Sequence, residues 1–400
     1  ASDMNWNSVC HNGVVQTALG VLDDREERAF YVASAEKFIR NYLRGFGPDG
    51  YCNEGMGYWT YGFTHFTQLS ELVLQATGGK VNFFDLPGAK SAAMYPTNLE
   101  ITRGVFPSYA DCALDARPPA RLSSFLARHY RVPLTRGDVS DLTAREGLVA
   151  TLMYSFLRPE LAEPMSRDAQ AAPLRSFFDH GGVLVSRPAA GSNCRMAVSF
   201  KGGHNAESHN HNDLGTFVVA LGNELLILDP GGEIYTSRTF SKERYKSNLL
   251  NSFGHPVPVI AGKLQRQGKE AAARIIRTDF TDARDIFALD ITSAYDVPEL
   301  QKLTRQFTYD RTGEGSLQVV DEFEFSSPQT YGGALLTYKK IEVLEDGSVV
   351  IRGDSAAVKV TIDAGGAAYD LMQEAIEEQT HSGAKPTRLG INLREPLESG

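Results

Sequence analysis

The stretch IEVLEDGSVVI, residues 341–351, contains two short apolar runs on either side of the turn Glu345-Asp346-Gly347. Short apolar runs divided by turn residues are typical of strands in a hairpin. The same texture recurs in segments 225–228, 286–292, 317–325 and 358–362. Because strand follows strand without an intervening helix, we expect antiparallel pairing, for which a sandwich is the natural closure. We therefore predict an antiparallel β-sandwich over residues 181–400.

The first 180 residues show helical periodicity instead. Asp24 and Glu27 have the spacing of a capping box, and the apolar residues that follow recur on one helical face until Gly45. The segment 66–76, ended by two glycines, and the segment 142–156 repeat this pattern. The prediction is an α+β protein with two domains, a helical one over residues 1–180 and a β-rich one over residues 181–400. The tail 380–400 shows little periodicity.

Composition and charge exclude several classes of protein. Hydrophobic residues make up 42% of the 400-residue chain, which is enough for a sizeable core and excludes a disordered chain. The net charge of −9 argues against a protein that wraps nucleic acid. No apolar run approaches the ~18 residues that a bilayer crossing needs, and residues 1–5 have no signal-peptide pattern. Four cysteines without a CxxC pair predict neither a disulfide framework nor a cysteine zinc site.

Three of the nine histidines fall within eight residues, at His204, His209 and His211. On an extended strand, residues 209 and 211 would point to the same side and could share one metal ion. Asp229, at the end of an apolar strand, and His255 could complete a site of two imidazoles and one carboxylate, which suits zinc. The alternative is a polar loop with solvated imidazoles, and the residues alone leave both interpretations open.

Four stretches carry a family resemblance when they are taken in order. They are NWNSVC at 5–10, NEGMGYWTYG at 53–62, SHNHND at 208–213, and LDPG at 228–231 followed by NSFGH at 251–255. In this order they resemble the heparinase II/III-like polysaccharide lyases, which include related alginate lyases. The resemblance implies an α/α toroid joined to an antiparallel β-sandwich, with a substrate groove between them. In that family the helical domain begins well before the Asn motif, so the toroid of this chain would be incomplete.

The resemblance also implies roles for individual residues. Asn7 would contact the carboxylate of the substrate, Tyr58 would be the catalytic tyrosine, and His209 would face the substrate. A second tyrosine of the family matches Tyr245 best, with Tyr235 as the alternative. The residues that match the zinc ligands are His211, Asp229 and His255. The implied substrate is an anionic polysaccharide, and the implied location is periplasmic or secreted.

The implied reaction, β-elimination at a uronic acid, explains why these residue types are needed. Hydrogen-bond donors such as Asn7 and His209 would stabilise the charge that develops on the uronate. A tyrosine can take the proton from the sugar carbon and return one to the leaving oxygen, which contributes ~10²–10⁴-fold. We expect the zinc to be structural, because it would hold the strand from which His209 points.

Two further residues are candidates for substrate binding. Arg244 is one of four basic residues in the span 238–246, and its planar fork suits a carboxylate or sulfate. Glu54 would either bind substrate or cap a helix. The sequence leaves two other functions open, a non-catalytic protein that binds acidic polysaccharide and a zinc-dependent hydrolase. It does not predict the polymer, endo or exo action, or the oligomeric state.

Overall fold

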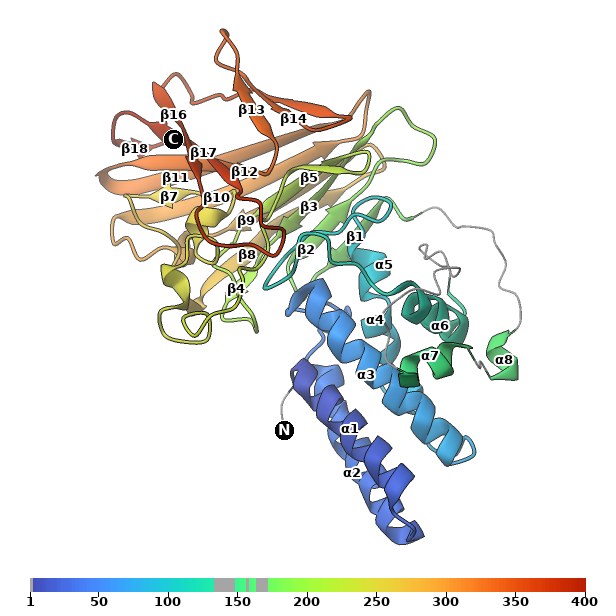
Figure 1. Cartoon of the computed structure of the whole chain (residues 1–400). Coiled ribbons are helices and arrows are strands. Elements are labelled where there is room, and N and C mark those ends of the chain that lie inside the picture. The colour runs from blue at the N-terminus through green and yellow to red at the C-terminus, as the bar shows by residue number, and fades with distance from the viewer. Residues whose placement is uncertain (1–2, 133–147, 156–157, 163–171) are drawn as a thin grey trace. The chain divides into compact units, whose positions relative to one another are not determined.

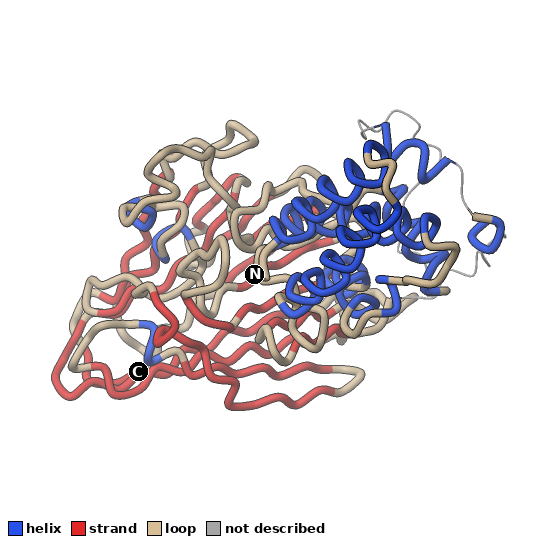
Figure 2. The backbone as a smooth tube through the Cα atoms, turned by 90° about the horizontal axis from the view of Figure 1, so that it is seen from below, coloured by secondary structure: helices blue, strands red, loops and turns tan. Residues whose placement is uncertain are grey.

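The computed structural model describes residues 3–132, 148–155, 158–162 and 172–400. The chain divides into two compact units, one formed by Ala1–Asn98 and Arg117–Ala172 and the other by Leu99–Ala116 and Pro173–Gly400. Helices gather in the first unit and strands in the second (Figure 2). The predicted boundary at 180/181 places segment 99–116 in the helical domain, whereas in the structure this segment belongs to the strand-rich unit. The assignment of domains stays a prediction.

The helical unit is built around three long helices, α1 (Asn5–Val21), α2 (Arg25–Arg44) and α3 (Gly55–Ala76). Figure 1 shows α1 lying along α2 and α3, and it contacts both. The shorter helices are α4 (Ala89–Ala93), α5 (Tyr95–Leu99), α6 (Ala120–Tyr130), α7 (Leu148–Ser155) and α8 (Pro159–Ala162). None of the helices in the described ranges combines the length and apolarity of a bilayer-spanning segment.

The predicted start and end of α2 are confirmed. The carboxylate of Asp24 accepts a hydrogen bond from the backbone N–H of Glu27 at 2.8 Å, as an N-cap should, and Gly45 is the C-cap. The predicted helix around 66–76 is also confirmed as part of α3. Of the predicted helix 142–156, residues 148–155 form α7, and the remainder lies outside the described residues.

Helix α1 was not recognised as a helix from the sequence, because most of the residues that it buries are polar. Asn5, Ser8 and Asn12 are buried against α3, and the hydroxyl of Ser8 donates to the carbonyl of Gly62 at 2.7 Å. A Cβ on Gly62 would lie 2.6 Å from the Tyr42 hydroxyl and 3.0 Å from the Cβ of Asn5. The glycine therefore lets the two helices approach closely.

The strand-rich unit contains four antiparallel sheets. The first has the order β1-β2-β3-β5-β6 and the second the order β18-β11-β10-β9-β8-β4. The first sheet comprises β1 (Arg175–Phe178), β2 (Val183–Ser186), β3 (Met196–Lys201), β5 (Phe217–Leu221) and β6 (Glu224–Ile227). The second comprises β4 (Gly203–Asn205), β8 (Gly268–Phe280), β9 (Arg284–Asp290), β10 (Leu300–Asp310), β11 (Ser316–Gln329) and β18 (Leu397–Ser399).

Two smaller sheets complete the unit. One has the order β16-β17-β12-β7 and the other β13-β14-β15. Their strands are β7 (Val259–Ile260), β12 (Tyr331–Thr337), β13 (Lys340–Val343), β14 (Val349–Arg352), β15 (Ala357–Val360), β16 (Tyr369–Ala375) and β17 (Thr387–Leu393). The antiparallel pairing predicted from the sequence is confirmed, for example in the hairpin β13–β14. The tail 380–400 is more regular than expected, since β17 and β18 lie in it.

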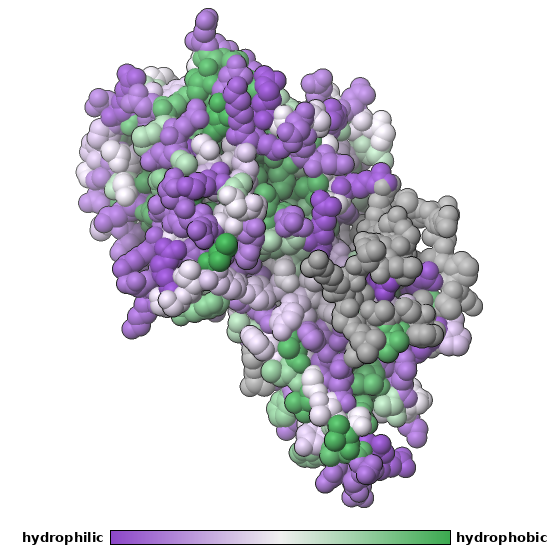
Figure 3. Space-filling view, in the orientation of Figure 1, coloured by the Kyte–Doolittle hydropathy of each residue, from purple (hydrophilic) through white to green (hydrophobic). Residues whose placement is uncertain are grey.

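The first two sheets share one hydrophobic core. The ring of Phe200 in β3 stacks on that of Phe307 in β10 with centroids 4.3 Å apart, and Phe287 in β9 lies beside them. Along β10, buried and less buried residues alternate with the period of two that a strand facing a core should show. Polar side chains cover much of the visible face of this unit (Figure 3). The loops at the ends of these strands carry the candidate site.

Candidate metal centre and substrate site

His209 and His211 lie in the loop 206–216 between β4 and β5. The extended strand considered for residues 209 and 211 is not observed, because this described loop contains no strand. His209 has φ 56°, in the left-handed region, which interrupts an extended backbone. Such a conformation costs roughly 1–3 kcal/mol for a non-glycine residue and is frequent at functional sites.

The three residues predicted as metal ligands lie together. His211 comes from the loop after β4, Asp229 follows β6, and His255 is the C-cap of the short 3-10 helix Ser252–Gly254. All three side chains are 0% exposed, and one potential ligand atom from each lies within 4.8 Å of the others. This arrangement could hold a metal ion.

Buried polar atoms in this triad support that fit. Nδ1 of His211, Oδ2 of Asp229 and both ring nitrogens of His255 make no hydrogen bond within the described part of the chain. Nδ1 of His255 lies 3.1 Å from Oδ2 of Asp229, but the geometry is not that of a hydrogen bond. Buried polar groups are rarely left unsatisfied, and two atoms bound to one zinc are separated by about this distance when each lies ~2.0–2.2 Å from the ion. Two imidazoles and a carboxylate therefore fit zinc.

Asp111 joins this triad to His209, and the sequence analysis did not identify it. One carboxylate oxygen, Oδ2, lies 2.9 Å from Nδ1 of His209. The other, Oδ1, lies 3.1 Å from Nε2 of His211 and accepts a hydrogen bond from Arg244 at 2.6 Å. Burial alone would raise the pKa of Asp111, but its contacts with both histidines and Arg244 hold that pKa well below its usual range. The carboxylate is therefore a buried anion with three partners.

Two glycines explain how Asp111 reaches this position. Segment 108–112 lies directly against segment 229–232, where the hydroxyl of Ser108 donates to the carbonyl of Asp229 at 2.6 Å. A Cβ on Gly231 would lie 2.3 Å from the carbonyl oxygen of Cys112, and one on Gly232 would lie 3.0 Å from the Cα of Asp111. Only glycine permits this approach. The Pro-Gly-Gly sequence after Asp229 was the available signal, although it could not name the partner segment.

Arg244 and Tyr245 lie beside the same loop. The guanidinium of Arg244 donates to the carbonyl of Asn210 through Nε at 3.2 Å and Nη2 at 3.0 Å. The hydroxyl of Tyr245 lies 3.2 Å from the side-chain nitrogen of Asn210. Asn210 separates the two histidines in sequence, so both residues lie next to the His209 loop. The ring of Tyr235 instead packs edge-on against Phe240.

Ion pairs moderate the positive charge of the basic span 238–246. Arg238 pairs with Glu233 at 2.6 Å, Lys246 pairs with Glu243 at 2.6 Å, and Arg244 pairs with Asp111. Lys242 is exposed. Arg244 differs from the others because its partner also contacts His209 and His211.

A second charge cluster includes two residues of the loop 206–216, the half-buried Glu207 and the buried Asp213. Lys201 pairs with Asp213 in the interior, and Glu207 lies near both. Burial raises the pKa of Glu207 to about 7, with Asp213 adding to the rise and Lys201 opposing it. The sequence analysis did not single out these three residues.

The remaining predicted site residues belong to the helical unit. The carboxylate of Glu54 accepts hydrogen bonds from the backbone nitrogen and the side-chain amide of Asn5, at 3.0 and 2.8 Å. Glu54 is also the N-cap residue of α3, although its side chain makes no capping hydrogen bond there. Asn7 is buried in α1 and donates to the carbonyl of Phe38 at 3.2 Å. Tyr58 is half-buried in the first turn of α3.

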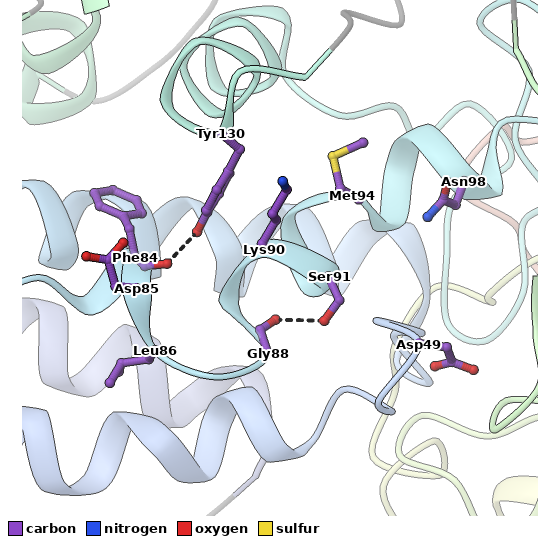
Figure 4. Close-up of a pocket in the computed structure, with 10 residues that line it drawn as sticks. All are labelled: Asp49, Phe84, Asp85, Leu86, Gly88, Lys90, Ser91, Met94, Asn98 and Tyr130. Carbon is purple, nitrogen blue, oxygen red and sulfur yellow. Dashed lines mark hydrogen bonds between the residues drawn. The ribbon is translucent and has the colours of Figure 1, made fainter. Parts of the chain in front are cut away.

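A pocket of about 690 Å³ lies within the helical unit (Figure 4). Its ionisable lining side chains include Asp49, Asp85 and Lys90, and the Tyr130 hydroxyl donates to the carbonyl of Phe84 at its edge. None of the predicted site residues lines it. Two carboxylates against one ammonium group do not favour a polyanionic ligand.

The family model for the heparinase II/III-like C-terminal region matches residues 171–389, more than half of the chain. The chain belongs to the heparinase II/III-like family. The match includes His209, Arg244 and the three candidate metal ligands His211, Asp229 and His255, here called the metal triad. No curated protein sequence matches the chain significantly.

Solved heparinase structures have the same fold as this family member. One heparinase III structure has a TM-score of 0.70 at 13% identity, covering 97% of this chain and 57% of the other. A second has a TM-score of 0.67 at 12% identity, covering 97% and 60%. The heparan sulfate lyase HepC from Pedobacter heparinus has a TM-score of 0.66 at 12% identity, covering 94% and 54%. The chain therefore spans three fifths or less of the length of these proteins.

Proposed function

We propose that this protein is a polysaccharide lyase that cleaves a uronate-containing polymer by β-elimination. The observation that carries the proposal is the cluster of His209, Asp111, Arg244 and Tyr245 against a buried metal triad, in a member of the heparinase II/III-like family. The similar solved structures are named as heparinase III and heparan sulfate lyase. The helical unit is proposed to be a portion of an α/α toroid.

Elimination removes the proton next to the uronate carboxylate and expels the glycosidic oxygen. The developing negative charge on the carboxylate needs hydrogen-bond donors, and we assign this role to Asn7 and His209. Since Nδ1 of His209 contacts Asp111, the substrate would meet Nε2 of that ring. Arg244 would bind a carboxylate or sulfate of the polymer, and Glu54 stays a weaker substrate-binding candidate.

Tyrosine is the proposed proton-transfer group. Tyr58 would take the proton from the sugar carbon and return one to the leaving oxygen. Tyr245 is the second tyrosine of this mechanism, supported by its position beside the His209 loop. A tyrosine can accept a proton as the phenolate and donate one as the phenol, which the two halves of an elimination require.

The metal triad has a structural role in this proposal. His211, Asp229 and His255 would hold a zinc ion, which would supply a fixed point for the loop that carries His209. Complete burial of the three ligands supports this role over that of a zinc hydrolase, which needs an open position for water. The predicted substrate is an anionic polysaccharide, and the proposed location is periplasmic or secreted.

The test is a panel of heparin, heparan sulfate, alginate and neutral polymers incubated with zinc-loaded protein. Elimination leaves a conjugated double bond at the new end, so ultraviolet absorbance should rise with at least one uronate polymer and with no neutral polymer. Binding of a polymer without any rise in absorbance would support the non-catalytic alternative. Chain cleavage without a rise would support a hydrolase.

A further inference from the structure

Asp111 lies between the metal triad and the proposed catalytic groups, and neither the metal site nor the proposed reaction yet assigns it a role. Its side chain is 0% exposed, and it belongs to none of the sequence motifs that define the site. Its partners are 98, 100 and 133 residues away in the sequence. One planar carboxylate thus connects three segments of the strand-rich unit.

The two carboxylate oxygens of Asp111 contact different partners. Oδ1 contacts both the metal-ligand candidate His211 and Arg244, at 3.1 and 2.6 Å. Oδ2 contacts His209 at 2.9 Å. Because the two oxygens are fixed relative to each other, the orientation of His211 is linked to those of His209 and Arg244.

We propose that Asp111 is a positioning residue that couples occupancy of the metal triad to the orientation of His209 and Arg244. The part of this inference that concerns polymer rests on the proposed function. The part that concerns metal does not.

The chemistry of a metal-bound histidine supports this coupling. A histidine that binds a metal through one ring nitrogen usually donates its other N–H to a carboxylate, and loss of that carboxylate typically lowers metal affinity 10–100-fold. Here Nε2 of His211 faces Asp111, whereas Nδ1 makes no hydrogen bond within the described chain. A metal on Nδ1 would fix the ring, and the ring would then fix Asp111.

The first experiment measures zinc affinity by competition with a chromophoric chelator. Asp111→Asn should bind zinc about 10–100-fold more weakly than wild type. Asp115→Asn, which changes an exposed carboxylate in the same segment, should bind zinc like wild type. Circular dichroism checks that both variants are folded. Zinc affinity in Asp111→Asn equal to that of wild type, or a wild-type protein that binds no zinc, would overturn the proposal.

The second experiment begins with wild-type protein, and this first part stands even if Asp111→Asn does not fold. Affinity for heparin and for alginate is measured with zinc and after chelation. Zinc should strengthen polymer binding, and polymer should strengthen zinc binding by the same factor. In Asp111→Asn this mutual effect should fall below about twofold, an outcome that general destabilisation would not give.

The outcomes separate this inference from the proposed function. Zinc coupling without elimination would reject the lyase and keep the positioning role. Elimination at a rate that does not depend on zinc, with polymer affinity equal in the two zinc states, would keep the lyase and reject the positioning role. If no polymer binds, the proposed function and the polymer part of the inference are rejected, and the zinc affinity of Asp111→Asn decides the metal part.

Discussion

Tyr58 is the residue to which we assign the proton transfer. Tyr58→Phe keeps the ring and removes the hydroxyl, so the elimination rate should fall at least ~10²-fold while polymer binding stays near normal. The measurement is the initial rate of absorbance increase at saturating polymer. If Tyr58 only packs in α3, the change should cost ~0.5–1.5 kcal/mol of stability and leave most of the rate.

Arg244 should bind anionic polymer more strongly than its basic neighbours. Arg244→Ala should weaken binding roughly tenfold or more, because charged hydrogen bonds are worth about 1.5–3 kcal/mol, and should reduce the salt dependence of binding. Lys246→Ala is the matched control, since Lys246 lies two residues after Arg244, is exposed and pairs with the exposed Glu243. Titrations at low and high salt compare the two. Equal losses in both variants would contradict a special role for Arg244.

Glu207 should make stability depend on pH. Its pKa is raised from 4.5 to about 7 by burial, so the folded state binds this proton more tightly than the unfolded state. Its contribution is therefore fully present below the unfolded pKa and is lost as the pH rises through about 7. Relative to Glu207→Gln, wild type should lose on the order of 1–3 kcal/mol between about pH 5 and about pH 8. Urea unfolding at each pH measures this, and parallel curves would refute it.

At the scale of elements, the candidate metal ligands His211, Asp229 and His255 come from three separate loops, which a bound ion would join. Removal of zinc should therefore lower the melting temperature of the strand-rich unit, since a bound ligand at a hundredfold excess over Kd adds about 2.7 kcal/mol. His255→Ala should be insensitive to chelator, whereas His209→Ala, which changes a histidine outside the triad, should stay sensitive. Calorimetry with and without chelator measures both. A wild-type melting temperature unchanged by chelation would rule out a structural ion.

Elements with a strong local signal were predictable from the sequence. The capping box of α2 and the hairpin β13–β14 lie where the pattern indicated. Helix α1 was missed because its buried side carries Asn and Ser, which give no apolar period. For the histidine segment the sequence left an extended strand and a polar loop open, because the left-handed backbone of His209 has no sequence signature in a non-glycine residue. Asp111 was missed because its contacts join distant segments.

At the scale of the whole molecule, the two units contribute different residues to the proposed reaction. The strand-rich unit carries the metal triad, His209 and Arg244, and it contains most of the region that matches the family model. The helical unit carries Asn7 and Tyr58. The similar heparinase structures are longer than this chain, so the activity of these 400 residues is a proposal that needs its own measurement.

Mass spectrometry of the cleavage products tests that central claim most directly. Zinc-loaded protein is incubated with the uronate polymer that it binds most tightly, and the small products are weighed. Elimination divides the chain without adding water, so the summed mass of the products should equal that of the parent, and one new end should be unsaturated. Products heavier than the parent by one water per cleavage, or a polymer that is bound and never cleaved, would contradict the lyase.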